Sequence, residues 1–172
     1  MSALSEPQAG EYNPYYESYV SFVKGKNIAD VLRNQIDDVR QAFGQLGEEG
    51  SQKAYAAGKW TGKELLGHIT DTDRIMAYRA LCIARGEQAA LPGYDENAYA
   101  SNGFFNGLSL GSLLDEFEAS RYALLALLKN LPEATHTIKG NANNSPVSVR
   151  ALFYIIAGHT EHHLNILKTR YF

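Results

Sequence analysis

The chain has 172 residues, of which 45% are hydrophobic and 20% charged, and its formal net charge is −3. These values are typical of a soluble globular protein whose length suits a single domain with a sizeable core. The small negative charge gives no reason to expect nucleic acid or an anionic membrane as a partner.

Cysteine content and hydropathy indicate the cellular compartment. The single cysteine, Cys82, excludes an intrachain disulfide and a cysteine-rich zinc site. The first residues lack the basic segment and apolar core of a secretory signal. Since no apolar run approaches the ~18 residues that cross a membrane, we expect a cytoplasmic protein without a membrane partner.

The N-terminal part is unusual in composition. Residues 1–10 are small and polar, and we expect them to be flexible, with residues 11–172 forming one domain. The segment from Glu11 to Val23 gathers aromatic side chains around Pro14. These are Tyr12, Tyr15, Tyr16, Tyr19 and Phe22. We expect an aromatic arm packed over the domain; a wall of a ligand pocket or a dimer contact is the alternative.

Apolar residues at helical spacing predict long helices over most of the remaining chain. They run from about Ile28 to Leu46, Thr61 to Arg85, Ser109 to Leu131, and Ser148 almost to the C-terminus. The second opens with Thr61-Gly62-Lys63-Glu64, a capping-box pattern. The connections are turn-rich and no segment alternates as a strand does. The predicted fold class is therefore all-α, a four-helix bundle, in which cofactor sites lie between facing helices.

The last helix carries histidines within its apolar stripe. At roughly 100° per residue, His159 and His163 fall near the centre of an arc otherwise made of Leu and Ile. Residues at i and i+4 stack one turn apart, so both rings can reach one point. Burying neutral imidazoles without partners costs on the order of 1–3 kcal/mol each. A metal ion removes that cost, so we predict a metal site inside the bundle.

A catalytic zinc-type site needs three protein ligands and an open position. The best third candidate is His68, in the middle of the second helix. His162 lies roughly 60° from His159 and 100° from His163 around the helix. It could replace either as a ligand, but we favour a hydrogen-bonding role next to the ligands.

Further candidates follow on the second helix. Asp71, one turn after His68, could supply a carboxylate ligand or orient an imidazole N–H. Arg79 projects near the His68 side and could hold an anionic substrate group, whereas ion pairing is the alternative for both Arg74 and Arg79. Glu64 could act as a base or support the site, although helix capping is its simpler role.

The ligand types restrict the metal and the chemistry. Imidazoles suit zinc, nickel, copper and iron, and a carboxylate from Asp71 would make iron more plausible. The sequence contains no phosphate-binding loop and no nucleophile elbow. Thr160 follows His159, so the zincin pattern His-Glu-x-x-His is absent. We expect His136 to be exposed in a polar connection and Glu161 to point away from the stripe.

The order of these residues resembles the DinB/YfiT-like superfamily. The matching motifs are Trp60-x-x-x-Glu64-x-x-x-His68-x-x-Asp71 and Gly158-His159-x-x-His162-His163-Leu164-Asn165-Ile166, with likeness along the whole chain. The resemblance implies a four-helix bundle and one divalent metal ion, zinc or nickel before iron, held by His68, His159 and His163. It also implies a homodimer. Relatives include thiol S-transferases that use a low-molecular-weight thiol such as bacillithiol, a mycothiol-dependent isomerase, and metal-dependent hydrolases.

Two classes of function remain open. In an enzyme, the metal would carry a water or the thiolate of a small thiol and act on a small-molecule substrate, with Tyr78, Arg79 and the aromatic arm as pocket candidates. A non-catalytic, metal-stabilised stress-response or binding protein would instead close the site with a fourth ligand, such as His162 or Asp71. In a third case the site holds no metal in the cell, and the histidines pair with one another or with Asp71.

Overall fold

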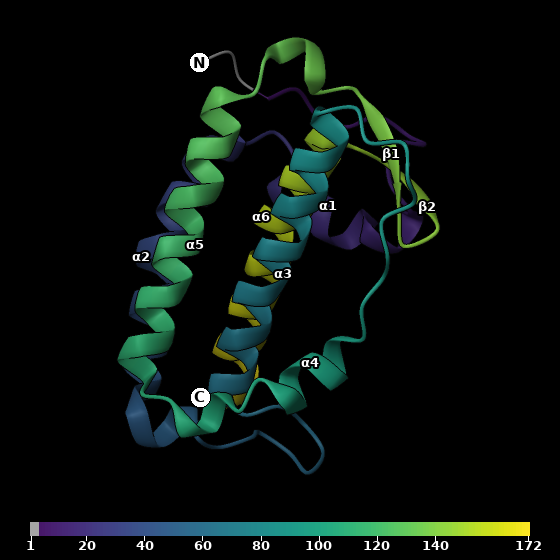
Figure 1. Ribbon diagram of the computed structural model, residues 1–172. Helices are drawn as coiled ribbons and strands as arrows, with labels where there is room; N and C mark the ends of the chain where they lie inside the picture. Colours follow the sequence, from purple (N-terminus) through teal and green to yellow (C-terminus); the bar gives the residue numbers. More distant parts are fainter. Residues whose placement is uncertain (1–3) are drawn as a thin grey trace.

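The computed structural model describes residues 4–172, and four long helices dominate that part of the chain (Figure 1). They are α2 (Ile28–Ser51), α3 (Gly62–Ala84), α5 (Leu110–Asn130) and α6 (Val149–Ile166), the last continued by a π-helical turn, η4 (Leu167–Tyr171). Helix α2 packs against α5, and α3 packs against both α5 and α6. The predicted four-helix bundle is therefore confirmed. No helix within residues 4–172 is long and apolar enough to cross a membrane.

Shorter elements lie beside the bundle and at its ends. They are η1 (Pro14–Tyr16), α1 (Glu17–Val23), α4 (Glu96–Asn102), η2 (Phe105–Gly107), η3 (Glu133–Thr135), β1 (Lys139–Ala142) and β2 (Ser145–Ser148). Figure 1 shows α1 and the hairpin beside the upper half of α3 and α6, and α4 beside their lower half.

Side-chain caps explain where the long helices begin. The Asn27 side chain accepts from the backbone N–H groups at the start of α2. Thr61 forms the predicted capping box at the start of α3, and Ser109 and Ser148 cap α5 and α6. Helix α2 runs beyond its predicted end at Leu46. It passes through a kink at Gly47, whose φ of 70° lies in the left-handed region that glycine adopts freely.

The hairpin of β1 and β2 is a correction to the sequence analysis, which found no strand. The two strands pair antiparallel, with Lys139 opposite Ser148 and Ala142 opposite Ser145. Asn143 and Asn144 form the turn with φ values of 52° and 59°, a conformation that asparagine tolerates. Each strand has only four residues, too few for a period of two to stand out.

The aromatic arm packs over the bundle as predicted. Helix α1 packs on α6, and Val20 and Val23 join the core. Of the residues expected to be flexible, 1–3 lie outside the described part of the chain. Leu4 is buried, and the Ser5 hydroxyl accepts from Arg150 Nη1 at 2.7 Å. The domain boundaries stay a prediction.

A polar layer crosses the bundle between two apolar clusters. One cluster contains Leu32, Met76, Leu124 and Ile156; the other contains Val39, Ile69, Phe117 and Leu164. Between these positions each long helix contributes one polar residue to a hydrogen-bonded group: Gln35, Asp73, Arg121 and Thr160. The candidate site adjoins this layer: His159 directly precedes Thr160 on α6, and His68 lies between one and two turns before Asp73 on α3.

Candidate metal centre

The structure brings three predicted histidines together. His68 of α3 and His163 of α6 each place Nε2 at 3.0 Å from Nε2 of His159. The candidate ligand atoms of the three all lie within 4.8 Å of one another, and all three side chains are buried. The convergence across two helices is the arrangement that a single ion bound by three imidazoles requires.

Gly67 precedes His68 and Gly158 precedes His159. Each glycine allows a neighbouring element to pack closely against its helix. A Cβ atom on Gly67 would lie 2.4 Å from the ring of Phe105 in η2. A Cβ atom on Gly158 would lie 1.9 Å from the carbonyl oxygen of Tyr19 in α1. Only hydrogen fits at both positions, so these glycines allow neighbouring elements to cover the histidines.

The electrostatic surroundings keep the imidazoles neutral. Burial lowers the pKa of His68 to about 4, with a smaller contribution from His162. Burial also lowers the pKa of His159 and of His163 well below the ordinary value, and neighbouring histidines add to the effect. A neutral imidazole offers a nitrogen lone pair, which is the form that binds metal ions.

The donor set fits a metal ion. Each neutral imidazole has one N–H and one lone pair. Nε2 of His159 lies 3.0 Å from Nε2 of both His68 and His163. Depending on the tautomer, this atom carries either one lone pair or one N–H, so it cannot form a full hydrogen bond with both neighbours. An ion at the common point would accept all three lone pairs at once, and imidazole ligands suit zinc, nickel, copper and iron.

The neighbours proposed to support the ligands do not contact them through hydrogen bonds. Among residues 4–172, the buried Nδ1 atoms of His159 and His163 have no hydrogen-bond partner. His162 is half-buried outside the converging group, with its ring centroid 5.1 Å from that of Tyr19. Asp71 is half-buried, its carboxylate lies 4.0 Å from Arg74 Nη1, and burial raises its pKa. Neither residue belongs to the group of converging ligand atoms in the described part of the chain.

Other predicted candidates occupy structural positions. The backbone N–H of Thr61 donates to Glu64 Oε2 at 2.7 Å, which confirms the capping role of Glu64. Arg74 Nη1 pairs with Glu116 Oε1 at 2.5 Å. Tyr78 is 57% exposed and does not line the cavity beside the histidines.

The predictions for His136 and Glu161 have different outcomes. His136 is buried, which corrects the expectation of an exposed side chain: its backbone N–H and C=O are bonded to η3 and α6 and draw it inward. Glu161 points away from the cluster as expected, and accepts from Gln35 Nε2 at 2.7 Å.

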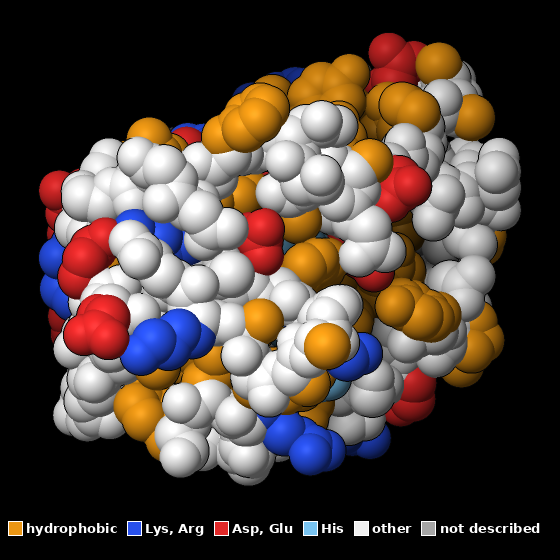
Figure 2. Space-filling view, turned by 90° about the horizontal axis from the view of Figure 1, so that it is seen from below, with side chains coloured by type: hydrophobic (Ala, Val, Ile, Leu, Met, Phe, Trp, Pro, Cys, Tyr) orange, Lys and Arg blue, Asp and Glu red, His pale blue; other side chains and the backbone are white. Residues whose placement is uncertain are grey.

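Two cavities reach the histidine cluster from different sides. The first, about 270 Å³, is bordered by His159 and by Arg79, Thr72 and tyrosines of the arm. The second, about 230 Å³, is bordered by His163, Trp60 and Tyr171. Figure 2 shows the molecule from below, with small areas of histidine visible in recesses between hydrophobic side chains. The cluster is therefore buried, and His159 and His163 each border a cavity.

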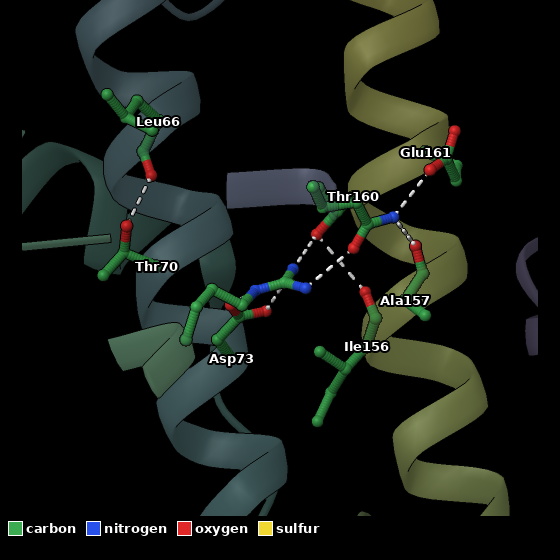
Figure 3. Close-up of polar contacts among 9 residues, drawn as sticks. Leu66, Thr70, Asp73, Ile156, Ala157, Thr160 and Glu161 are labelled. Atoms are coloured by element: carbon green, nitrogen blue, oxygen red, sulfur yellow. Dashed lines mark hydrogen bonds and ion pairs between the residues drawn. The ribbon is translucent and has the colours of Figure 1, made fainter. Parts of the chain in front are cut away.

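The polar layer links α3 and α6 through Arg121 of α5, and sequence reasoning missed it. Arg121 donates from Nε to Asp73 Oδ2 at 2.5 Å, from Nη1 to Gln35 Oε1 at 2.7 Å, and also bonds Thr160. Figure 3 shows Asp73 of α3 and Thr160 of α6 in the hydrogen-bonded group that joins the two helices. An arginine within the Leu-rich stripe of α5 was the available signal.

Comparison with known proteins places the chain in a family. Residues 32–167, most of the chain, match the DinB superfamily. A sequence comparison with curated proteins finds no match. The solved structure of YfiT from Bacillus subtilis, described as a probable metal-dependent hydrolase with an unusual four-helix bundle topology, superposes with a TM-score of 0.75 at 16% identity. The match covers 95% of this chain and 90% of YfiT, and at this identity it shows the fold. Because the family match spans most of the sequence, the protein belongs to the DinB superfamily, with the four-helix bundle topology of YfiT.

Proposed function

We propose that the protein is an enzyme that uses one divalent metal ion, held by the Nε2 atoms of His68, His159 and His163, to act on a small molecule. The observation that carries the proposal is the convergence of three buried, neutral imidazoles at one point. The DinB family and the description of YfiT as a probable metal-dependent hydrolase support it.

The surroundings favour a catalytic site over a closed structural one. A structural zinc site has four protein ligands, whereas the group here has three, with His162 and Asp71 outside it. When bound, the ion would supply Lewis acidity at an open coordination position. The protein would hold the ion with the three imidazoles, admit substrate through the cavities, and limit water with the tyrosines of the arm.

Hydrolysis is the reaction that we propose first, because YfiT is described as a hydrolase. Transfer of a small thiol to a second substrate is the second candidate. It is favoured by the two cavities, since one borders His159 and the other His163, so that two molecules can approach the same centre. Zinc or nickel is the proposed ion, with iron next. The small thiol, the homodimer and the cytoplasmic location stay predictions.

Elemental analysis of untagged protein, purified without chelators, tests the proposal. We expect about one equivalent of zinc, nickel or iron in the wild type, as three imidazole ligands imply, and its loss in His68→Ala. Asp71→Asn is the matched control on the same helix and should keep the metal. Wild-type protein that is metal-free and takes up no added zinc, nickel or iron would contradict the proposal. A positive result would be followed by ester hydrolysis and thiol-transfer assays.

A further inference from the structure

Arg79 is a buried cation without a buried anion. Among the described residues three arginines are buried: Arg79, Arg121 and Arg150. Arg121 pairs with Asp73, and Arg150 pairs with Glu11. Arg79, 3% exposed, donates from Nη2 to the carbonyl oxygen of Pro92 at 2.7 Å and lies 3.4 Å from Met76 Sδ through Nη1. No carboxylate within residues 4–172 lies within 4.0 Å of its guanidinium.

The buried positive charge of Arg79 lacks a compensating negative charge among the described residues. A guanidinium stays protonated at all accessible pH values, so Arg79 cannot escape the cost of burial by losing its charge. A buried charge is stabilised by an opposite charge with good hydrogen-bond geometry. One carbonyl and one thioether use two of the five N–H groups, which leaves capacity for a bidentate oxyanion.

The cavity beside Arg79 is one of the two that border the histidine cluster. Its lining includes both Arg79 and His159, and its volume of about 270 Å³ lies just below the usual range of small-molecule sites. The lining also includes the ring of Tyr19, whose centroid is 5.5 Å from that of His159, and the hydroxyl pair of Thr72 and Tyr94 at 2.7 Å. The cavity therefore offers a cation at one side, hydroxyl groups and an aromatic wall, and the histidine cluster at another side.

One acidic residue, Glu96, also belongs to the described lining of this cavity. It is exposed on α4, so that water and salt screen its charge. The buried charge of the described lining is thus positive, and screening of Glu96 leaves Arg79 as the dominant charge for a bound ligand.

We propose that Arg79 binds an oxyanion group of the substrate, a carboxylate or a phosphate, and so orients a small anionic molecule along the tyrosine wall toward the histidine cluster. Arg79 acts in binding and specificity. The inference rests on the proposed function in taking the cavity as the substrate site, and it narrows that function to small anionic substrates.

Binding of simple probes tests the inference without an assay of turnover. Benzoate, phenyl phosphate and the neutral benzamide share one ring and differ in charge, and their affinities can be measured by calorimetry. Because carboxylates also coordinate metals, both zinc-loaded and metal-free protein are used. We expect at least one anion to bind about tenfold more tightly than benzamide in both forms, the effect of a charge-assisted hydrogen bond. The tighter anion identifies carboxylate or phosphate as the preferred group.

Arg79→Gln should abolish this preference while retaining the metal content of the wild type. Arg74→Gln is the matched control, since Arg74 lies on the same helix but pairs with Glu116 on the surface, and it should keep the preference. Equal affinities for the anions and benzamide in the wild type, or a preference that survives in Arg79→Gln, would overturn the inference. A measurement independent of the variant's folding is the Nε–Hε NMR signal of Arg79 in the wild type. That signal should shift on saturation with the preferred anion, and an unchanged signal would count against the site.

The outcomes separate the two proposals. Protein that binds metal through His68 but shows no anion preference would contradict the role of Arg79 and leave the metal centre intact. Protein that binds no metal but prefers the anions through Arg79 would contradict the proposed enzyme and support the anion site.

Discussion

Gly158 lies directly against the backbone of Tyr19, and a Cβ atom at Gly158 would sit 1.9 Å from the Tyr19 carbonyl oxygen. The contact lets α1 pack on α6 one residue before His159. It also places the Tyr19 ring between His159 and His162, with centroid distances of 5.5 and 5.1 Å. The aromatic arm therefore packs against the histidine cluster because a glycine permits backbone contact.

Gly158→Ala is expected to destabilise the protein by about 1–3 kcal/mol, the usual range for overpacking, because a backbone atom cannot move aside as a flexible side chain can. Urea unfolding followed by circular dichroism measures the change. The control is Gly44→Ala on α2, where an added Cβ meets no atom within 4 Å; it should stabilise by about 0.5–1 kcal/mol, as alanine does in a helix interior. Equal stability of Gly158→Ala and wild type would show that α1 does not hold this position.

His163→Ala and His162→Ala, neighbours on one helix, should differ sharply in metal binding. Nε2 of His163 belongs to the converging group, whereas the His162 ring packs on Tyr19 and Phe22. We expect His163→Ala and His159→Ala to lower metal affinity by well over tenfold, as loss of one of three ligands implies, while the bundle stays helical. His162→Ala should keep the wild-type stoichiometry. Competition titration with a chromophoric chelator measures both, and loss of a full metal equivalent in His162→Ala would make His162 a ligand.

Arg121→Met should be among the most destabilising single changes in the bundle. It leaves the Asp73 carboxylate buried without its partner, and Gln35 loses a hydrogen bond. Breaking a buried pair in this way costs about 3–5 kcal/mol. Arg40→Met removes exposed ion pairs with Asp115 and Glu118 and should cost about 1 kcal/mol or less. Similar unfolding free energies for the two variants would mean that the polar layer does not stabilise the fold.

Glu11 should make stability depend on pH in the acid range. It accepts from Arg150 Nε at 2.7 Å and from the Ser148 hydroxyl at 2.8 Å. The hydrogen bonds from Arg150, opposed by burial, lower the pKa of Glu11 below its ordinary value of 4.5. The unfolded chain therefore binds the proton first, so this stabilisation is complete above pH 4.5 and is lost as pH falls through the lowered folded value.

Glu11→Gln should consequently reduce the decline in melting temperature below pH 4.5, measured against the wild type over the same range. Glu49→Gln is the control, because Glu49 pairs with Lys53 on the exposed surface where solvent screens the interaction. A decline in Glu11→Gln as steep as in the wild type would show that other carboxylates are responsible.

Much of this molecule could be predicted from local patterns. The caps at Thr61, Ser109 and Ser148, with the apolar periodicity, give the starts of α3, α5 and α6 because both signals act within a few residues. The pairing of His159 with His163 follows from the helical repeat alone. The hairpin and the burial of His136 were missed because their hydrogen bonds join segments whose local sequence resembles an ordinary loop.

The sequence by itself determined the four helices, the family resemblance and the histidines that could meet. Only the tertiary structure decided that His68 reaches the other two, that His162 and Asp71 lie outside the converging group, and that Arg79 shares a cavity with His159. The physical reason is that helical periodicity specifies which residues share a face, whereas the facing of two helices depends on side chains from the whole core. In this protein those include the contact of Gly158 with Tyr19 and the buried pair of Arg121 and Asp73.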